Sequence, residues 1–255
     1  MFHLIGLAGR ARSGKDTAAR FLLQHSDVSS YALADPVKMA CQALFGLSHD
    51  ETWSDSHKEQ TIALWNRSPR QFFQLVGTEW MRAERPDHWI RRAEQLLRRE
   101  ATAVPDSNSP LAMAMQAIYG MTASTPYCDF WQMSYAQASE RLLSLCTQSY
   151  PDYMERRAQR AVLQSQYRYP DANKSDCVII RDIRYENEAQ FIRDSGGQIW
   201  HIHRAQAQAV HPHSSELGIS QQAGDAQVQN NGTLQELQQQ LERLWQEFRQ
   251  THPKP

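Results

Sequence analysis

Short apolar runs alternate with amphipathic stretches near both ends of the chain. A run of about four to eight apolar residues is typical of a buried strand, whereas apolar residues three or four apart are typical of a helix with one buried face. Strands that alternate with helices predict an α/β fold, in which helices cover both faces of a five-stranded parallel sheet. The expected strands are 3–8, 31–34, 177–182, 198–203 and 226–228, and helices are expected to begin near residues 15, 36, 186 and 234.

The long segment between the second and third of these strands has a different pattern. About 140 residues there carry helical spacing without a clear strand signal. Residues 70–97 are dense in polar and aromatic side chains, 101–126 are rich in Ala, Met and Pro, and 130–166 predict two helices interrupted near Pro151. We therefore expect a large helical insertion in the α/β core.

Composition and charge narrow the range of partners. The net charge is -1, so binding to nucleic acid would need a local basic patch, and no direct nucleic-acid binding is expected. Only five of the 27 basic residues are Lys, and the guanidinium of Arg suits bidentate contacts with phosphate. No run approaches the roughly 20 apolar residues that a membrane span needs, so no membrane partner is expected. The four Cys residues lie far apart, which predicts buried free thiols rather than disulfides or zinc ligands: Cys41, Cys128, Cys146 and Cys177.

The segment "GRARSGKDT" lies between the first predicted strand and the first predicted helix. Its spacing, Gly9-x-x-x-x-Gly14-Lys15, is that of a phosphate-binding loop. In such a loop the backbone N–H groups and the positive end of the helix bind a polyphosphate, and Lys15 would reach the β and γ phosphates. The alternative is an ordinary glycine turn, which the position between a buried strand and a helix disfavours.

The residue after Lys15 is Asp16, where phosphate loops usually carry Ser or Thr. The usual hydroxyl binds Mg²⁺, and a carboxylate can also bind this ion, directly or through water. The negative charge would repel a triphosphate, and Arg10 and Arg12 are placed to offset that repulsion. Thr17 keeps a hydroxyl that can donate to an α-phosphate. Asp16 is therefore a candidate metal ligand.

A second charged motif is "VIIRDIR". The strand that ends at Asp182 delivers a carboxylate to the carboxyl edge of the sheet, where open α/β folds bind ligands. Arg184, two residues further on, could hold a phosphate there. The alternatives are that Asp182 caps a turn and that Arg184 is a surface residue. The phosphate loop favours a shared site, because strands 3–8 and 177–182 are expected to be neighbours.

Six motifs together resemble a known family. In chain order they are "SGKDT", "LADPVK", "RQFFQLVGTEW", "DIRYENE", "HSSE" and "NNGTLQEL", and their order and character resemble those of bacteriophage deoxynucleoside monophosphate kinases. That family belongs to the P-loop monophosphate kinases, so the resemblance implies their three-layer P-loop kinase fold. It covers about the first 100 and the last 80 residues and leaves 101–170 unmatched. The family tolerates Asp after the loop lysine, although Asp16 also resembles animal phosphomevalonate kinases.

The resemblance implies ATP-dependent phosphorylation of deoxynucleoside 5′-monophosphates to diphosphates, which supplies DNA precursors, with ATP and Mg²⁺ as cofactors. No covalent intermediate and no general base are needed. Two alternatives stay open: a kinase of another phosphorylated small molecule, such as phosphomevalonate or dephospho-coenzyme A, and a non-catalytic NTP-binding protein. A base-binding pocket in the segment 70–89 would favour the nucleotide kinase.

Residue by residue, the resemblance also implies the site. Lys15, Arg184 and Asp182 would be catalytic, with Asp16 and Asp182 around the metal. ATP would bind Gly9, Arg10, Ala11, Arg12, Ser13, Gly14, Lys15, Asp16 and Thr17. The acceptor monophosphate would bind Lys38, Arg70, Gln74, Thr78, Glu79, Arg82, Trp89 and Arg184. A lid that closes over the phosphates would include Arg204, His213 and Glu216.

The same resemblance divides the chain into regions. Residues 1–35 and 171–255 would form the P-loop kinase core, 36–100 the monophosphate-binding helical region, and 101–170 a helical insertion of unknown role. A lid, a homodimer surface and inert structure are the roles left open for the insertion. The protein is expected in the cytoplasm, which is that of the host if a phage encodes it.

Several side chains have plainer alternatives. Lys38 could equally be a surface lysine, and Trp80 is expected to pack in the core of the helical region. His201 and His203 share one face of a predicted strand, but zinc is the weaker explanation because no Cys or carboxylate set accompanies them at ligand spacing. The motif "NNGT" resembles the loop beside the adenine of ATP in related kinases, and its alternative is a turn with a helix cap.

Overall fold

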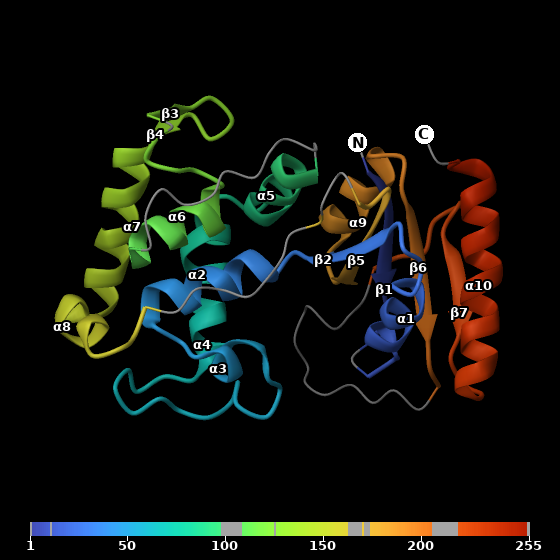
Figure 1. Cartoon of the computed structure of the whole chain (residues 1–255), viewed down its shortest axis with the longest axis horizontal. Coiled ribbons are helices and arrows are strands. Elements are labelled where there is room, and N and C mark those ends of the chain that lie inside the picture. The colour runs from blue at the N-terminus through green and yellow to red at the C-terminus, as the bar shows by residue number, and fades with distance from the viewer. Residues whose placement is uncertain are drawn as a thin grey trace. The chain divides into compact units, whose positions relative to one another are not determined.

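The computed structural model describes residues 2–10, 12–97, 109–124, 126–162, 170, 174–205 and 219–253. The chain divides into two compact units. The core unit comprises Met1–Leu33, Leu97–Arg99 and Tyr169–Pro255, and the helical unit comprises Ala34–Leu96 and Glu100–Arg168. Figure 1 labels the elements of both units. No helix within the described ranges has the length and hydropathy that would let it span a bilayer.

The core unit is built on a five-stranded parallel sheet with the order β2-β5-β1-β6-β7. The predicted α/β fold with a five-stranded parallel sheet is therefore confirmed. The apolar pattern predicts the second strand too late, at 31–34, because the polar Ser29 and Ser30 interrupt it, although both residues pair with β5. The strands are β1 (His3–Ala8), β2 (Val28–Ala32), β5 (Cys177–Ile183), β6 (Gln198–His203) and β7 (Ala226–Gln229).

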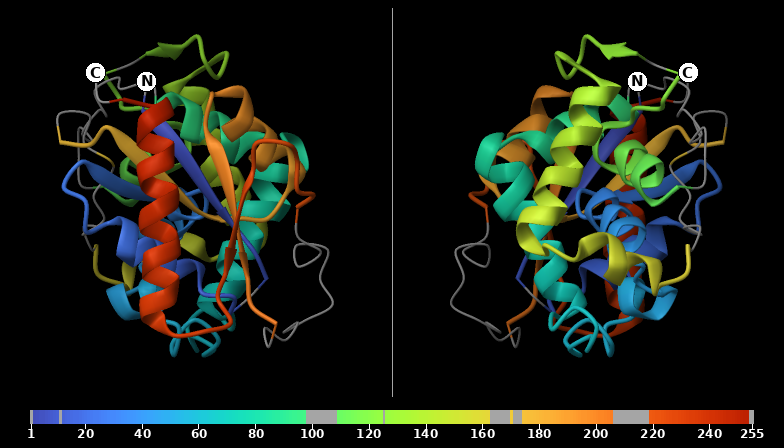
Figure 2. Two further views of the ribbon diagram at one scale, coloured as in Figure 1. Left: turned by 90° about the vertical axis from the view of Figure 1, so that its right-hand side faces the viewer. Right: turned by 90° about the vertical axis from the view of Figure 1, so that its left-hand side faces the viewer.

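Helices cover both faces of this sheet, which gives three layers. The helices α1 (Lys15–Leu22) and α10 (Leu234–Thr251) share one apolar cluster with the sheet, and α9 (Glu186–Asp194) packs against β1 and β6 on the other face. The red C-terminal helix lies along the sheet in the left view of Figure 2. Gly6 lets α9 approach closely, since a Cβ there would lie 2.6 Å from the Cδ1 atom of Ile192.

A capping box begins the last helix. Thr233 caps α10, and its hydroxyl accepts from Glu236 N while the Glu236 carboxylate accepts from Thr233 N. Leu234 is 66% exposed, because it occupies the first turn, outside the apolar cluster. The buried stripe consists of Leu237, Leu241, Trp245 and Phe248.

The helical unit departs in two places from the helices that the sequence predicts. Its segment 127–134 forms a small antiparallel pair of strands, where no strand was expected. Another departure is a π-helix, η1 (Leu75–Arg82), which directly continues α4 (Pro69–Gln74). The other elements are α2 (Asp35–Phe45), α3 (His49–Trp53), α5 (His88–Leu97), α6 (Pro110–Tyr119), β3 (Tyr127–Cys128), β4 (Met133–Ser134), α7 (Tyr135–Ser149) and α8 (Tyr153–Ala158).

The helix α8 caps the carboxyl end of α2. Arg157 Nε donates to the carbonyl oxygen of Ala43 at 3.0 Å, and the Tyr153 hydroxyl donates to that of Leu44 at 2.9 Å. The terminal carbonyls of a helix have no partners within the helix and carry partial negative charge, so a guanidinium is a favourable partner. This part of the segment expected to be an insertion therefore has a structural role in the helical unit.

The cysteine prediction is confirmed, apart from the exposure of one residue. All four Cys are free, and Cys128 is half-buried rather than buried. Burial raises the pKa of the Cys41 thiol well above its ordinary value and that of Cys146 to about 12. These thiols are therefore unreactive at neutral pH, because the thiolate is the nucleophile.

Candidate active site

The phosphate loop of the core unit connects β1 to α1. At both of its glycines, the backbone conformation and the neighbouring atoms leave no room for a side chain. Gly9 has a φ of +149°, and a Cβ there would lie 2.5 Å from the carbonyl oxygen of Ile202. Gly14, the N-cap of α1, has a φ of +104°. Ala11 is outside the described residues.

The ammonium group of Lys15 is held inside this loop. Its Nζ donates to the carbonyl oxygens of Gly9, at 2.7 Å, and Arg10, at 3.0 Å. The same Nζ lies 3.3 Å from Oδ1 of Asp182, at the end of β5. The structure thus joins the loop lysine to the carboxylate of the second charged motif, which lies 167 positions later in the chain by numbering (182 − 15).

A β-bulge aims Asp182 toward the loop. Between the pairs Gly6–Ile180 and Ala8–Ile183 the register of β1 and β5 shifts, so that two residues of β5 lie opposite one residue of β1. Asp182, inside this bulge, has a φ of +63°. Bulges redirect side chains, and a non-glycine residue with positive φ is uncommon and often marks a functional site.

Asp182 also binds Arg184, so that it lies between two cations. Arg184 Nε donates to Oδ2 of Asp182 at 2.6 Å, and Nη2 contacts the same oxygen. Burial alone would raise the pKa of Asp182, but the charges of Arg184 and Lys15 and their hydrogen bonds outweigh it, and the pKa is lowered from its ordinary value. Asp182 is therefore ionised at neutral pH. The predicted catalytic residues Lys15, Asp182 and Arg184 form one ion cluster.

Glu188 fixes the backbone that carries this arginine. Its Oε2 accepts from Arg184 N at 3.0 Å and from Tyr185 N at 3.2 Å, and the side chain is buried. The sequence motifs assign no role to Glu188. The available signal was its position three residues after Tyr185, where a Glu commonly returns to the start of its own helix.

The other predicted nucleotide residues line the start of α1. Arg10, Arg12 and Asp16 are exposed, and Thr17 is half-buried. Asp16 lies in the first turn of α1, where the helix dipole favours a negative charge. Within the described part of the chain, no group of three or more His, Cys, Asp or Glu side chains is placed to hold a metal ion on its own.

The turn after β7 closes the other side of the loop. Asn230 Nδ2 donates to the carbonyl oxygen of Ser13 at 2.7 Å, and Asn230 N donates to that of His203 at 2.7 Å. The resemblance assigns no site role to Asn230 itself, although Asn230 is the first residue of the motif "NNGT". Next to it is a surface hollow of about 320 Å³, lined by Gln229, Asn231, Gly232, Glu236, Gln239, Gln240 and Arg243.

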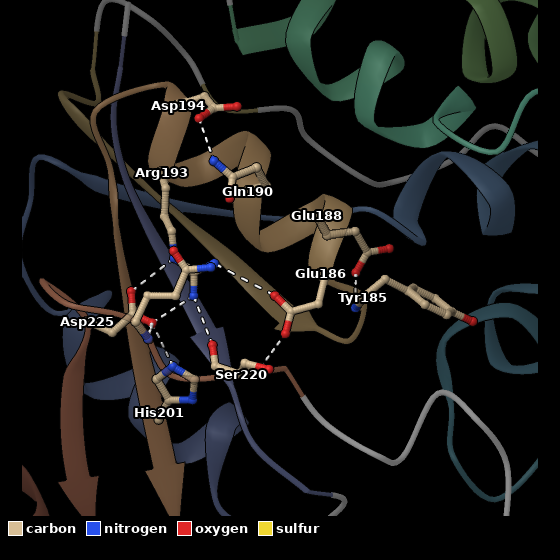
Figure 3. Close-up of polar contacts among 10 residues, drawn as sticks. Tyr185, Glu186, Glu188, Gln190, Arg193, Asp194, His201, Ser220 and Asp225 are labelled. Carbon is tan, nitrogen blue, oxygen red and sulfur yellow. Dashed lines mark hydrogen bonds and ion pairs between the residues drawn. The ribbon is translucent and has the colours of Figure 1, made fainter.

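The lid residues are only partly placed. Arg204 is exposed directly after β6, and His213 and Glu216 lie outside the described residues. Ser220, near the start of the described segment 219–253, is bound to α9, because Arg193 Nη2 donates to the Ser220 carbonyl oxygen at 3.2 Å (Figure 3).

The two strand histidines have different surroundings. His201 Nε2 lies 3.1 Å from Oδ2 of Asp225, and Arg193 binds the same carboxylate at 2.7 Å (Figure 3). The His201 and His203 rings stack at 6.2 Å. Burial would raise the pKa of Asp225, but hydrogen bonds from Arg193, the Gln222 backbone and His201 lower it. His201 thus belongs to an ion cluster that ties β6 to α9.

The segment "RQFFQLVGTEW" of the helical unit contains the π-helix. Ala83 N donates to the carbonyl oxygen of Thr78, which is the i to i+5 bond of this helix type. π-Helical turns are rare and occur frequently at functional sites. The predicted acceptor residues of this segment are exposed, apart from the last, which is half-buried: Gln74, Thr78, Glu79 and Arg82.

The remaining acceptor candidates have partners in the helical unit. Lys38 Nζ lies 4.9 Å from the centre of the Trp53 ring, and Arg70 forms an ion pair with Glu59. Trp89 is only 4% exposed. Its indole Nε1 donates to a carbonyl oxygen of η1, that of Gly77, at 2.9 Å. Trp80 is also buried, as expected.

The parallel sheet and the glycine loop before α1 are those of a P-loop kinase fold, and the ion cluster lies beside that loop. The family model described as deoxynucleotide monophosphate kinase matches residues 3–66 and 145–241. These residues make up more than half of the chain, which therefore belongs to the deoxynucleotide monophosphate kinase family, a family of nucleoside monophosphate kinases.

Two relatives extend the match. A protein of Acanthamoeba polyphaga mimivirus, provisionally named a deoxynucleotide monophosphate kinase, is 26% identical over 241 residues, which cover 93% of this chain and 93% of the relative. The deoxynucleotide monophosphate kinase of Escherichia phage RB69 is 22% identical over 255 residues, which cover 94% of this chain and 98% of the relative. Residues 145–170, left unmatched by the sequence motifs, lie inside the family match, whereas 67–144 lie outside it.

Proposed function

We propose that this protein transfers the γ-phosphoryl group of ATP to a deoxynucleoside 5′-monophosphate and releases ADP and the deoxynucleoside diphosphate. The observation that carries the proposal is the cluster of Lys15, Asp182 and Arg184 beside the phosphate loop. The names of the relatives support the acceptor class. Diphosphates of deoxynucleosides are intermediates on the way to DNA precursors.

The proposed chemistry needs positioning and charge stabilisation. The bond between the γ-phosphorus and its bridging oxygen breaks, and a phosphate oxygen of the acceptor forms the new bond to phosphorus. An ionised phosphate is already a nucleophile, so no side chain must remove a proton. Lys15 would stabilise the β and γ phosphates, and Arg184 the group in transfer. Asp182 holds both cations in place before the substrate arrives.

The residues around Lys15 have donor chemistry that fits Mg²⁺. Asp16 follows Lys15 and is exposed, and Oδ1 of Asp182 lies 3.3 Å from the Nζ of Lys15. Mg²⁺ prefers oxygen ligands and usually combines one or two carboxylates with waters and substrate phosphates. Both oxygens of Asp182 already contact cations, so we propose that Asp16 would hold the ion, with Asp182 as the second carboxylate of the site. When bound, the ion would supply positive charge that offsets the charge of the phosphate oxygens.

The same proposal assigns contact residues to the acceptor monophosphate and to the adenine of ATP. Arg70 and Arg82 would contact the acceptor phosphate, and the exposed side chains of α4 and η1 the base and sugar. Trp89 would act on the acceptor through η1, whose carbonyl it holds, because its own ring is buried. The polar hollow beside Asn230 would receive the adenine.

A coupled ADP-release assay tests the function. MgATP is supplied with each of the four deoxynucleoside monophosphates, with the ribonucleoside monophosphates and with phosphomevalonate, and Lys15→Ala is run beside the wild type. We expect deoxynucleoside monophosphates to stimulate ADP release and Lys15→Ala to abolish it. Stimulation by phosphomevalonate alone would contradict the acceptor class, and no stimulation by any monophosphate would contradict the kinase assignment.

A further inference from the structure

The turn after β7 reaches the phosphate loop through one side chain. Asn230 Nδ2 donates to the carbonyl oxygen of Ser13 at 2.7 Å, across 217 positions of sequence. The backbone of Asn230 is itself fixed, because its N–H donates to His203 O, at the end of β6. Since β6 lies between β1 and β7 in the sheet, Asn230 ties the loop to the ends of two strands.

The geometry of Gly14 depends on the same side chain. A Cβ at Gly14 would lie 2.2 Å from Asn230 Nδ2, far inside van der Waals contact. The φ of Gly14, +104°, is one that L side chains rarely adopt. The loop therefore leaves at Gly14 the space that the amide of Asn230 occupies.

Holding the Ser13 carbonyl also sets the direction of a hydrogen-bond donor. The peptide between Ser13 and Gly14 is planar, and in a trans peptide the C=O and the N–H point in opposite directions. No cis peptide is present in the described part of the chain. With Ser13 O directed at Asn230, the N–H of Gly14 is directed away from it, as one of the free donors at the start of α1.

We propose that Asn230 is a positioning residue for the ATP phosphates: it orients the Ser13–Gly14 peptide so that the Gly14 N–H is available to them. This inference rests on the proposed function, because it takes ATP as the ligand of the loop. A purely structural role would lower stability without distinguishing the two substrates. If Asn230 is a positioning residue, its loss weakens the binding of ATP and leaves the binding of the acceptor unaffected.

The test measures binding of a non-hydrolysable ATP analogue with Mg²⁺ by calorimetry, together with the KM values for ATP and for a deoxynucleoside monophosphate. Asn230→Ala removes the donor, and the near-isosteric Asn230→Asp replaces it with an acceptor that repels Ser13 O. One hydrogen bond is worth about 0.5–1.5 kcal/mol, or about 2- to 12-fold in affinity. We expect Asn230→Ala to weaken the analogue about 5-fold and Asn230→Asp more than 10-fold, with the acceptor KM within 2-fold of wild type.

Matched controls separate this effect from charge and folding. Gln227→Ala and Gln227→Glu make equivalent changes at an exposed amide of β7, the strand that precedes Asn230, and should leave analogue binding within 2-fold of wild type. Thermal unfolding shows whether each variant is folded, and Asn230→Asp preserves the side-chain shape if Asn230→Ala does not fold.

The outcomes distinguish the two proposals. If the wild type binds no analogue, the proposed function fails. If it binds the analogue and folded Asn230→Ala and Asn230→Asp bind it equally well, or if both KM values rise together, the role of Asn230 is wrong. Gly14→Ala gives an independent check. It should weaken binding of the analogue less in the Asn230→Ala background than in the wild type, because the Nδ2 atom that the new Cβ would meet is then absent.

Discussion

Replacing Arg184 by Ala should separate activity from stability. The Arg184 and Asp182 side chains are 51% and 37% exposed, and an ion pair this accessible contributes at most about 1 kcal/mol to folding. Asp182 also keeps its second cation, Lys15, at 3.3 Å. We therefore expect Arg184→Ala to stay folded and to lower the unfolding temperature by no more than about 4 °C.

The expected loss of activity is much larger. Removing one preorganised donor to the charge that develops in a transition state costs about 2.7–4 kcal/mol, which is about 100- to 1000-fold in kcat. The loss should fall in kcat more than in either KM, because the group in transfer gains charge only on the way to the transition state. Without Arg184, Lys15 is also drawn more strongly to Asp182 and away from the phosphates.

The assay is steady-state ADP release with both substrates varied, accompanied by thermal unfolding. Arg184→Lys keeps the charge but loses the paired contact with the carboxylate, so its activity should lie between those of the wild type and Arg184→Ala. Turnover of Arg184→Ala within a few-fold of the wild type would refute the role given to this residue. A large loss of folding stability in the same variant would instead assign Arg184 to the fold.

Three further predictions concern stability. Burial lowers the pKa of His88 from 6.5 to about 3, so between these pH values only the unfolded state binds the proton, and folding stability falls as the pH drops below about 6.5. The loss at pH 5 is about 2 kcal/mol relative to pH 7.5. Denaturant unfolding at both pH values should show that His88→Gln removes this difference. Gly6→Ala should destabilise the core unit by about 1–3 kcal/mol, measured by denaturant unfolding, because its Cβ would collide with Ile192; no change would show that α9 shifts freely. Arg157→Met should cost about 2 kcal/mol by the same method, since it leaves the carbonyl of Ala43 without its guanidinium partner, and an unchanged unfolding free energy would exclude the capping role of α8.

Local sequence signals predicted the core of the fold well. Strand β5 begins with four buried apolar residues, 177–180, which the charged Arg181 and Asp182 follow before Ile183 ends it. The spacing of Gly9 and Gly14 marks the loop after β1. The boundary of β2 was wrong because a strand in the sheet needs backbone partners, which Ser29 and Ser30 supply as well as an apolar residue does.

The geometry of the site needed the tertiary structure. The bulge that turns Asp182 toward Lys15 depends on the register between β1 and β5, which no run of residues reveals. The contact of Asn230 with Ser13 joins distant parts of the chain and follows no periodicity. The π-helix at Leu75–Arg82 differs from an α-helix by one residue per hydrogen-bonded turn, which helix propensity does not distinguish.

Direct detection of phosphoryl transfer tests the proposed kinase activity. The wild-type protein is incubated with Mg²⁺, ATP labelled at the γ-phosphate and each deoxynucleoside monophosphate in turn, and the products are separated beside those of Lys15→Ala. We predict label in a deoxynucleoside diphosphate, with one ADP formed for each label transferred, and no transfer by Lys15→Ala. Label released only as inorganic phosphate, or no labelled diphosphate with any of the four acceptors, would contradict the account.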